Sequence, residues 1–339
     1  MKDEYISKLK IKIEEAGYDS KYSDCCCNYA TRLLENDVPV IFDIEHFAKL
    51  VGTSKEFICK LIFAEELFYK TIEIPKKRGG NRVLDIPSME LKYIQRWILD
   101  NILEHIPVSE NATGFKKHTS IVNNAKRHVN KDCLINIDIK DFFPSIDFVK
   151  VYKVFSYYGY TKEISFILAK LCTYKDRLPQ GSPASPALSN IVCLKLDARL
   201  DKLAEKYNAS YSRYADDITF SGPYGINKLA KIAGNILVDE GFTVNDKKTR
   251  IAYSYQRQEV TGIIVNNTTI RVSKQYKRKL WQEIYYCKKF GVTNHLENIG
   301  CTKLFYKEHL YGKAYFVNMV EPEEGKKILD SLREIEWSY

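Results

Sequence analysis

The sequence has no apolar run that approaches the ~18–20 residues needed to span a bilayer. Its N-terminus, Met1–Tyr5, is charged from the second residue onward and lacks the apolar segment of a secretory signal. Low-complexity linkers and internal repeats are also absent, and the 45% hydrophobic and 13% aromatic fractions exclude a disordered chain. These absences predict a soluble, cytoplasmic, globular protein that does not associate with membranes.

Paired cysteines are missing as well. The chain has nine cysteines, but none of them forms the Cys-x-x-Cys pair that is usual in zinc sites, and an odd number is unusual in a disulfide framework. Reduced thiols in a reducing compartment fit this pattern better. We interpret the run Cys25–Cys27 as partly buried side chains on a helix, with redox activity as the alternative.

Basic residues exceed acidic ones by 52 to 43, so the formal charge is +9, which favours a polyanionic partner. Residues 113–131 contain five Lys or Arg and no acid, and residues 271–289 contain seven against one acid. Four aromatic side chains are interleaved in the second stretch: Tyr276, Trp281, Tyr285 and Tyr286. Phosphate contacts and stacking on unpaired bases would use such residues, so we expect Lys277, Arg278 and Lys279 to contact a nucleic acid. A solvated helix face is the alternative.

The 339-residue length predicts two or three lobes. We expect helices in the first 66 residues, a hairpin from 67–75 and 82–86, and a helix after Ser88. Further helices are expected at 147–158, 161–173, 184–206 and 225–240, and from Lys274 onward. Strands are expected at 134–139, at 210–221 as a hairpin, and at 248–254, 258–265 and 269–273. Strands that meet in hairpins between helices favour an α+β sheet with helices on one face.

Three acidic residues stand out in this pattern. Asp138 ends a hydrophobic strand, and Asp216 and Asp217 lie at the tip of the 210–221 hairpin. If both strands belong to one sheet, the three carboxylates meet at one edge. Hard cations such as Mg²⁺ prefer oxygen ligands, and two ions about 3.5–4 Å apart can serve an in-line phosphoryl transfer. A solvated turn is the alternative for an Asp-Asp pair taken alone.

Five segments, in order along about half of the chain, resemble the motifs of reverse transcriptases. Tyr214–Asp217 resembles the Tyr-x-Asp-Asp box, and Asp138–Phe143 resembles the first catalytic strand and turn. Pro179–Pro186 is similar to the Gln-Gly-x-x-x-Ser-Pro segment, Lys77–Arg82 to the basic fingers hairpin, and Gly241–Thr249 to the segment before the primer grip. The resemblance implies an α+β right-hand polymerase that has RNA-directed DNA polymerase activity.

The resemblance also implies roles for individual residues. Asp138, Asp216 and Asp217 would be the catalytic ligands of two Mg²⁺ ions, with Mn²⁺ as a substitute. The nucleotide pocket would consist of Lys77, Arg78, Arg82, Asp141, Phe142, Phe143, Gln180 and Gly181. Phe143 would lie beneath the sugar and select dNTPs over rNTPs, with a core ring as its alternative. Lys248 would protonate the leaving pyrophosphate, with an ordinary surface lysine as the alternative.

Two shorter motifs narrow the family. Asn124 and His128 fit Asn-Ala-x-x-His, and Val260, Thr261 and Gly262 form Val-Thr-Gly; both resemble marks of retron reverse transcriptases. We interpret them as structural, with RNA contact as a second role. Retron membership implies a cognate structured non-coding RNA, priming from the 2′-hydroxyl of an internal guanosine, and multicopy single-stranded DNA linked to RNA. It also implies a separately encoded effector protein in antiphage defence.

Two alternatives stay open at this point. One is a group II intron-like or other bacterial reverse transcriptase, and the other is a catalytically silent RNA-binding scaffold. For the right hand we expect an N-terminal helical region at 1–66, fingers at 67–130 and 150–180, a palm at 131–149 and 181–265, and a helical thumb at 266–339.

Overall fold

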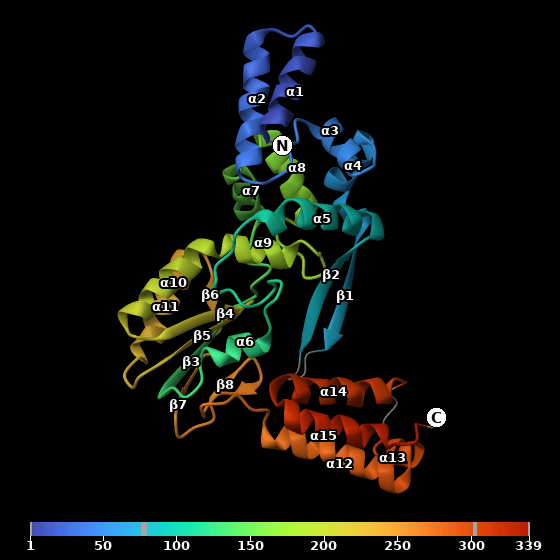
Figure 1. Cartoon of the computed structure of the whole chain (residues 1–339), viewed down its shortest axis with the longest axis vertical. Coiled ribbons are helices and arrows are strands. Elements are labelled where there is room, and N and C mark those ends of the chain that lie inside the picture. Colours follow the sequence, from blue (N-terminus) through green and yellow to red (C-terminus); the bar gives the residue numbers. More distant parts are fainter. Residues whose placement is uncertain (1, 76–79, 301–303, 338–339) are drawn as a thin grey trace. The chain divides into compact units, whose positions relative to one another are not determined.

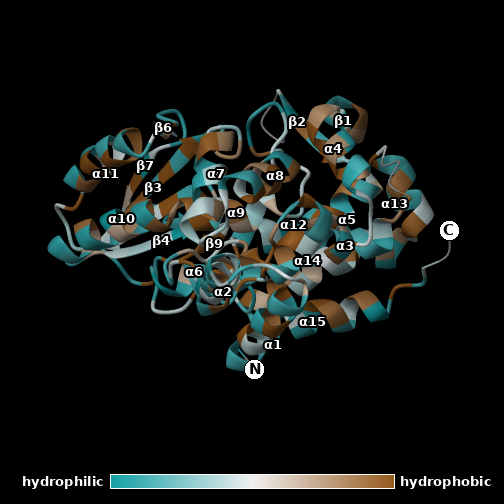
Figure 2. Ribbon diagram, turned by 90° about the horizontal axis from the view of Figure 1, so that it is seen from above, coloured by the Kyte–Doolittle hydropathy of each residue, from teal (hydrophilic) through white to brown (hydrophobic). Residues whose placement is uncertain are grey.

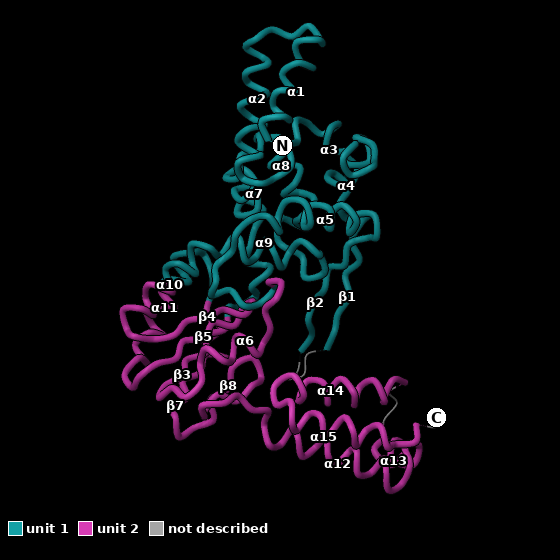
Figure 3. The backbone as a smooth tube through the Cα atoms, in the orientation of Figure 1, with its two compact units in different colours: residues 1–115, 139–199, 236–243 teal, residues 116–138, 200–235, 244–339 magenta. Residues whose placement is uncertain are grey.

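The computed structural model describes residues 2–75, 80–300 and 304–337 (Figure 1). The chain forms two compact units, each built from several chain segments (Figure 3). Unit 1 contains residues 1–115, 139–199 and 236–243, and unit 2 contains the remaining segments, 116–138, 200–235 and 244–339. Lys77 and Arg78 lie outside the described residues. Within the described part, no helix is both long and apolar enough to cross a membrane.

Unit 1 begins with the predicted helices: α1 (Lys2–Glu15), α2 (Ser20–Glu35), α3 (Ile44–Leu50) and α4 (Lys55–Phe63). Side-chain caps set three of their starts, because Asp19, Asp43 and Ser54 each accept a hydrogen bond from the backbone N–H three residues later. Leu33 and Phe47 are fully buried here. Phe47 also packs edge-on against Trp97, with ring centroids 5.7 Å apart, so the N-terminal helices share their apolar core with later parts of unit 1.

The hairpin predicted from 67–75 and 82–86 is present. A short 3₁₀ helix, η1 (Glu65–Phe68), leads into β1 (Tyr69–Pro75), which pairs antiparallel with β2 (Asn81–Pro87). Ser88 caps the following helix, α5 (Met89–Asn101), whose Leu91, Ile94 and Ile98 are buried. A second 3₁₀ helix, η2 (Leu103–His105), comes next. The helix predicted after Ser88 is therefore confirmed.

The described part of unit 1 also contains α7 (Phe148–Tyr157), α8 (Lys162–Cys172) and α9 (Ser185–Val192). The prediction of one helix over 184–206 was wrong at its centre, because α10 (Leu194–Lys206) is a separate helix. Cys193 ends α9 with φ −80° and ψ 0°, outside the α-helical range of ψ. Apolar residues are buried on both sides of this break, including Leu188 and Leu196, so periodicity gave no sign of it.

The largest sheet in the described residues has five strands in the order β4-β5-β3-β6, with β7 also beside β3. Their bounds are β3 (Cys133–Lys140), β4 (Ser210–Tyr214), β5 (Asp217–Gly222), β6 (Thr243–Val244) and β7 (Arg250–Tyr253). The pairs β3–β5, β3–β7 and β4–β5 are all antiparallel, as the α+β prediction requires. Helix α11 (Lys228–Asp239) connects β5 to β6. Six of the eight residues of β3 are buried, Asp138 among them, so both faces of this strand are covered.

The rest of unit 2 is a small hairpin and a helical C-terminal part. Helix α6 (Ile121–Lys126) packs against β8 (Glu259–Val260) and β9 (Ile263–Ile264). The single strand predicted at 258–265 is therefore a hairpin, because both residues of its tight turn, Thr261 and Gly262, have positive φ. The strand predicted at 269–273 was also wrong, since only an isolated bridge joins Ile264 to Arg271.

In the described residues that follow there are four helices: α12 (Lys274–Phe290), α13 (Val292–Asn298), α14 (Tyr306–Val320) and α15 (Pro322–Arg333). Figure 2 shows hydrophobic and hydrophilic residues alternating along α15, and its buried residues include Ile328, Leu329 and Leu332. These side chains share one core cluster with Leu280 of α12 and Leu310 of α14. The helical structure predicted from Lys274 onward is confirmed, and its amphipathic helices enclose a common core.

Candidate active site

Two paired strands bring the predicted catalytic acids together. Asp138 lies directly opposite Asp217 in the antiparallel pair β3–β5. Residues so paired have Cα atoms about 4.5–5.5 Å apart and side chains on the same face of the sheet. Asp216 immediately precedes Asp217 in the turn between β4 and β5. Acids 78 positions apart in the sequence are thus neighbours in unit 2.

A strained turn presents Asp216. Tyr214 pairs with Asp217, so the loop between the strands consists of Ala215 and Asp216 alone. Ala215 has φ +56°, and a positive φ at the first loop residue matches a type II′ turn, where glycine is ordinarily preferred. Arg213 Nη1 donates to the Ala215 carbonyl at 3.2 Å, and the Arg213 side chain is fully buried. This arginine therefore helps to hold the turn in a conformation that alanine adopts at a cost.

The Asp138 carboxylate has two side-chain partners. Asn245 Nδ2 donates to Oδ1 and Lys248 Nζ donates to Oδ2, both at 2.8 Å. The Asn245 backbone N–H also donates to the Asp138 carbonyl at 2.8 Å. Asp138 is only 5% exposed, so these bonds fix its side chain firmly.

The surroundings of Asp217 change the pKa of its carboxyl group. Desolvation by the surrounding chain and the negative charges of Asp216 and Asp138 raise the pKa of Asp217 to about 6. The positive charge of Lys248 acts in the opposite direction. The hydrogen bond to Asp138 raises the pKa of Lys248, so the ammonium stays charged at neutral pH. The three acids therefore interact strongly enough for one of them to resist ionisation.

This donor set is suited to a hard divalent cation. Carboxylate oxygens are the preferred ligands of Mg²⁺, and the crowding that raises the pKa of Asp217 would be relieved by a positive charge. In the part of the chain that the structure describes, no three His, Cys, Asp or Glu side chains are already arranged around a common metal position. Lys248 supplies the positive charge beside Asp138 in this arrangement. The residues fit a metal by chemistry and charge.

Sequence reasoning did not single out Arg213 or Asn245. Both faces of β4 are covered around Arg213, so the strand shows no alternation that would mark a functional side chain. Asn245 lies within a segment that the sequence did associate with the polymerase, but its bond to Asp138 spans 107 positions and depends on the tertiary fold. The sequence signal for Asn245 was its position three residues before Lys248, whose side chain bonds the same carboxylate.

The two aromatic residues after Asp141 have different environments in unit 1. Phe142 is buried and packs against Phe242 with ring centroids 6.0 Å apart. Phe143 is half-buried and lies 5.9 Å from the ring of Phe115. Asp141 is exposed and has φ +47°, which turns the chain sharply between β3 and these rings. Of the two rings, Phe143 is the one at the surface, and Phe142 is part of the core.

The other predicted pocket residues in unit 1 lie on the hairpin and the loop before α9. Arg82 is exposed on β2 and pairs with Ile74. Gln180 and Gly181 are half-buried, and the Gly181 backbone packs so closely on Asp85 and Ile86 that a Cβ atom would collide with the Asp85 carbonyl. Glycine is therefore required where this loop passes β2.

Comparison with known proteins decides the family. Residues 74–277 match the family described as reverse transcriptase (RNA-dependent DNA polymerase). The Retron Ec86 reverse transcriptase of Escherichia coli is 33% identical over 313 residues, which cover 91% of this chain and 94% of that protein. This chain belongs to the retron reverse transcriptases.

This chain is also similar to a second retron reverse transcriptase and to two solved structures. The Retron Mx162 reverse transcriptase of Myxococcus xanthus is 33% identical over 90% of this chain and 69% of that protein. A telomerase from Candida albicans, solved with a fragment of telomeric RNA, has a TM-score of 0.46 and 12% identity over 78% of this chain and 61% of its own. A foamy viral protease-reverse transcriptase solved with double-stranded DNA has a TM-score of 0.43 and 15% identity over 98% of this chain and 60% of its own.

Membership confirms the predictions of fold and activity and, in general terms, those of partners and metal dependence. The fold is a right-hand polymerase with an antiparallel palm sheet, and the enzyme is an RNA-directed DNA polymerase. Its partners are an RNA template and a DNA product, and the family depends on divalent metal ions in general. Asp138, Asp216 and Asp217 all lie within the matched residues.

The first retron mark forms a buried hydrogen-bonded network in unit 2. Asn124 and His128 are 1% and 0% exposed. His128 bonds Ser221 of β5 through Nδ1 and Ser212 of β4 through Nε2, both at 2.7 Å. Ser212 Oγ also donates to Asn124 Oδ1 at 2.6 Å. The motif thus fastens α6 to the hairpin that carries Asp216.

The network permits one arrangement of protons for a neutral imidazole. The Ser212 hydroxyl has a single hydrogen and gives it to Asn124, so Ser212 Oγ must accept from His128 Nε2. His128 Nδ1 is then the acceptor of the Ser221 hydroxyl. Burial, and the nearby charges of Arg127 and Lys131, lower the pKa of His128 to about 3, so the ring stays neutral. An interior position leaves these side chains no access to RNA in this conformation.

The second retron mark is the turn of the β8–β9 hairpin. Thr261 and Gly262 have φ +47° and +84°, which matches a type I′ turn and is unusual for a β-branched residue. Thr261 Oγ1 donates to the Ile121 carbonyl of α6 at 3.4 Å, and Val260 shares a core with Ala125. The two retron marks are therefore parts of one structural unit.

The basic residues predicted on α12 differ in their surroundings. Lys277 forms an ion pair with Glu321 at 2.7 Å, and both side chains are 20% exposed. Glu283, the acid of this stretch, pairs with Lys313 of α14. Arg278 and Lys279 are exposed. The outer face of α12 is therefore basic, while Lys277 stabilises the packing of the helices.

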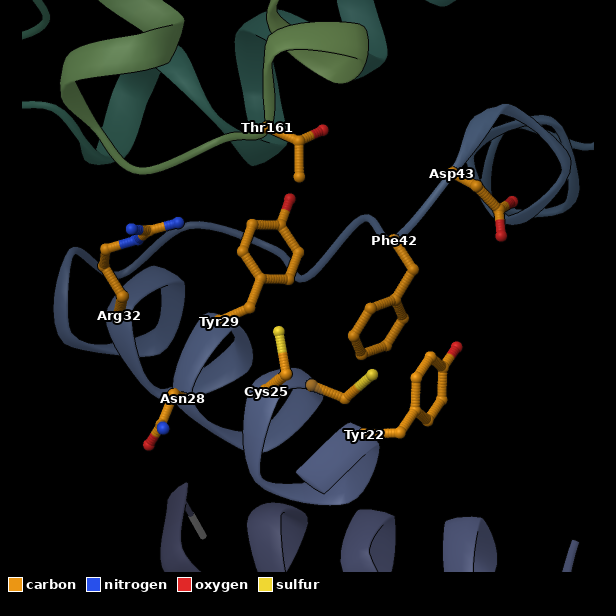
Figure 4. Close-up of a pocket in the computed structure, with 9 residues that line it drawn as sticks. Tyr22, Cys25, Asn28, Tyr29, Arg32, Phe42, Asp43 and Thr161 are labelled. Atoms are coloured by element: carbon orange, nitrogen blue, oxygen red, sulfur yellow. The ribbon is translucent and has the colours of Figure 1, made fainter. Parts of the chain in front are cut away.

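A separate pocket of about 540 Å³ lies in unit 1, against α2 (Figure 4). Its walls include Tyr29, Phe42 and Arg32, and Thr161 lies at its edge. Cys25 and Cys26 line it too, and burial raises the pKa of the Cys26 thiol, which lowers its reactivity. None of the predicted site residues that the structure describes lines this pocket.

Proposed function

We propose that this enzyme is the polymerase of a retron. It copies part of a cognate structured non-coding RNA into single-stranded DNA, starting from the 2′-hydroxyl of an internal guanosine, so that the DNA stays linked to the RNA. The observation that carries this proposal is the direct pairing of Asp138 with Asp217 in a chain that is 33% identical to a retron reverse transcriptase along nine-tenths of its length.

Asp138, Asp216 and Asp217 would hold two Mg²⁺ ions, for which Mn²⁺ can substitute. When bound, such ions lower the pKa of the attacking hydroxyl and neutralise the departing pyrophosphate. Asn245 orients Asp138 through two hydrogen bonds, one from its side chain and one from its backbone. Lys248 keeps its proton through its bond to Asp138, and it is 56% exposed, so it can donate that proton to a leaving group.

The incoming nucleotide would contact the predicted pocket residues. Arg82, with Lys77 and Arg78, would bind the triphosphate through charge-assisted hydrogen bonds. Phe143 would lie beneath the sugar, and Asp141, Gln180 and Gly181 would shape the pocket, whereas Phe142 supports Phe143 from the core. We assign residues 67–130 and 150–180 to the fingers, 131–149 and 181–265 to the palm, 266–339 to the thumb, and 1–66 to an N-terminal helical region.

RNA-templated extension of a DNA primer by the full chain tests the catalytic assignment. We expect Asp216→Ala or Asp217→Asn to lower the rate by at least about 100-fold, because each removes negative charge that the reaction needs. Asp100→Asn, at an exposed position of α5, is the matched control and should keep full activity. Full activity of the acid variants would instead favour a catalytically silent scaffold.

Sugar selection tests Phe143. We expect Phe143→Ala to increase the incorporation of rNTPs relative to dNTPs by roughly 10-fold or more, because the space occupied by the ring becomes available to a 2′-hydroxyl. The ratio of kcat/KM for dGTP and rGTP measures this effect. An unchanged ratio refutes the assignment and leaves Phe143 as a packing residue beside Phe115.

Isolation of the product tests the retron assignment itself. The enzyme would be expressed with the DNA that flanks its gene, and nucleic acid would then be extracted. A single-stranded DNA whose 5′ end is joined to RNA by a 2′,5′ bond is expected. DNA without such a branch would favour a group II intron-like enzyme. Loss of phage resistance when a neighbouring gene is deleted would identify the effector.

A further inference from the structure

Three tyrosine rings form an exposed stack in unit 2. The ring centroids of Tyr224 and Tyr253 are 6.1 Å apart, with planes inclined by 23°. Those of Tyr253 and Tyr255 are 5.7 Å apart, with planes inclined by 16°. Tyr224 and Tyr255 are 58% and 77% exposed. We call these three residues the tyrosine ladder.

Hydrogen bonds hold the ladder in place. The backbone N–H of Ser254, between two of the rings, donates to the Asp132 carbonyl at 2.8 Å, and its hydroxyl bonds the Tyr224 hydroxyl at 2.7 Å. Asn266 Nδ2 donates to the carbonyls of Ser254 and Gln256. A loop that is fixed in this way loses little conformational entropy when a ligand binds.

The ladder lies away from the catalytic acids. Tyr253 of β7 pairs with Cys133, at the start of β3, whereas Asp138 is five residues further along the same strand. At about 3.3 Å per residue, the two positions are about 17 Å apart. The ladder therefore cannot hold the base at which a nucleotide is added.

The offset of the rings leaves stacking surface available. Rings in contact have planes about 3.5–4 Å apart, so centroid distances near 6 Å imply a sideways displacement of about 4–5 Å between neighbours. Part of each ring face is thus uncovered, and the outer face of Tyr255 ends the stack. Planar bases bind to such faces without regard to sequence.

The surroundings favour a base over a protein side chain. Lys131 and Arg257 are balanced by Asp132 and Glu259, so phosphate attraction contributes little and stacking is the main interaction available. A protein interface usually has an apolar core, but here the loop between and after the rings is polar, and one exposed aliphatic residue, Ile251, precedes Tyr253 by two positions.

We propose that the tyrosine ladder binds unpaired bases of single-stranded nucleic acid by stacking, remote from the active site. The proposal rests on the proposed function in one respect, since a retron polymerase handles both unpaired RNA and its single-stranded DNA product. The ladder would keep an unpaired part of the RNA or of the DNA product on the enzyme while the active site copies another part of the RNA.

Binding of labelled decamers of uridine and of thymidine to the full chain tests the proposal. Because stacking on one ring is worth a factor of about 5 to 150, we expect Tyr255→Ala to weaken binding by that factor. Tyr255→Trp should keep the affinity, since it keeps a ring. Tyr157→Ala is the matched control, because Tyr157 is 82% exposed on α7 and should not affect binding. A loss with RNA alone, or with DNA alone, identifies which strand the ladder holds.

Three results would overturn the proposal: no measurable binding of either decamer by the unsubstituted chain, equal affinity of Tyr255→Ala, or an equal loss in Tyr157→Ala. A decamer that contains 5-iodouridine gives a second measurement, because irradiation should couple it covalently to a tyrosine of the ladder. Coupling to other residues alone would also contradict the proposal. Extension of a fully paired primer should be unchanged in Tyr255→Ala. Failure of the ladder is thus distinguishable from failure of the polymerase.

Discussion

Asp217 carries a charge that its neighbours disfavour. Asp138 has hydrogen bonds from Asn245 and a close ion pair with Lys248, whereas Asp217 experiences the negative charges of Asp138 and Asp216. The two acids therefore have different surroundings: Asp138 has hydrogen-bond donors beside it, and Asp217 has negative charges. Without a metal ion, the folded protein retains an unfavourable negative charge at Asp217.

We expect Asp217→Asn to stabilise the metal-free protein at neutral pH. The pKa of Asp217 in the folded chain, about 6, lies above its ordinary value of 3.8, so ionisation costs more in the folded state than in the unfolded state. Relative to the Asn variant, the stability of the unsubstituted protein should therefore fall as the pH rises from about 4 to 6, and the difference should stay constant above that.

Urea denaturation in the presence of EDTA, at several pH values between about 4 and 8, measures this difference. Added Mg²⁺ should reduce it, because a bound cation favours the ionised carboxylate. A difference that does not grow between about pH 4 and 6 would contradict the electrostatic account of the site.

At the scale of elements, α6 connects two hairpins of unit 2. Its Asn124 and the adjoining His128 bond the serines of β4 and β5, and the Thr261 hydroxyl of the β8–β9 turn bonds its first residue. The hairpin that carries Asp216 and the hairpin that precedes the C-terminal helices are thus joined through one short helix. This arrangement gives both retron marks a positioning role.

We expect His128→Ala to lower the free energy of unfolding by about 3 kcal/mol, because it leaves a cavity and two buried serine hydroxyls without their partner. His128→Gln should cost less, since it keeps a donor and an acceptor. Urea denaturation measures both effects, and RNA affinity, corrected for the folded fraction, should stay unchanged. Lost affinity with unchanged stability would show instead that His128 contacts RNA.

The sequence predicted elements whose signals are local and missed those that depend on distant contacts. The strand that contains Asp138 and the hairpin that turns at Asp216 were predicted because apolar alternation and turn residues lie within a few positions. The break at Cys193 and the hairpin within 258–265 were missed, because burial continues across the first and a threonine occupies the positive-φ position of the second. The partners of Arg213, Asn245 and His128 are tens of positions away, so spacing could suggest a shared face but no partner.

At the scale of the whole molecule, the charge of +9 is less informative than its distribution. Several lysines of the C-terminal helices are used internally, as Lys277 is by Glu321 and Lys288 by Glu334. Arg278 and Lys279 remain exposed on α12. Net charge therefore indicates a polyanionic partner, but ion pairing decides which residues are available to bind it.

We expect Arg278→Gln to weaken RNA binding and to reduce the slope of log affinity against log salt by about 1, because one phosphate contact is lost. Lys277→Gln should leave that slope unchanged and instead reduce stability, because it leaves the half-buried Glu321 unpaired. Filter binding of an RNA template at several salt concentrations distinguishes the two variants. Equal slopes for both would contradict the assignment of the α12 face.

The most direct test of the account is a change of ligand at Asp138. A thiolate at this position binds soft cations better than Mg²⁺. We expect Asp138→Cys to lower RNA-templated primer extension by at least about 100-fold in Mg²⁺, and Cd²⁺ to restore about 10-fold or more, while Asp138→Ala shows no recovery. Activity of Asp138→Cys that is intact in Mg²⁺, or lost equally with both metals, would contradict the claim that Asp138 is a metal ligand.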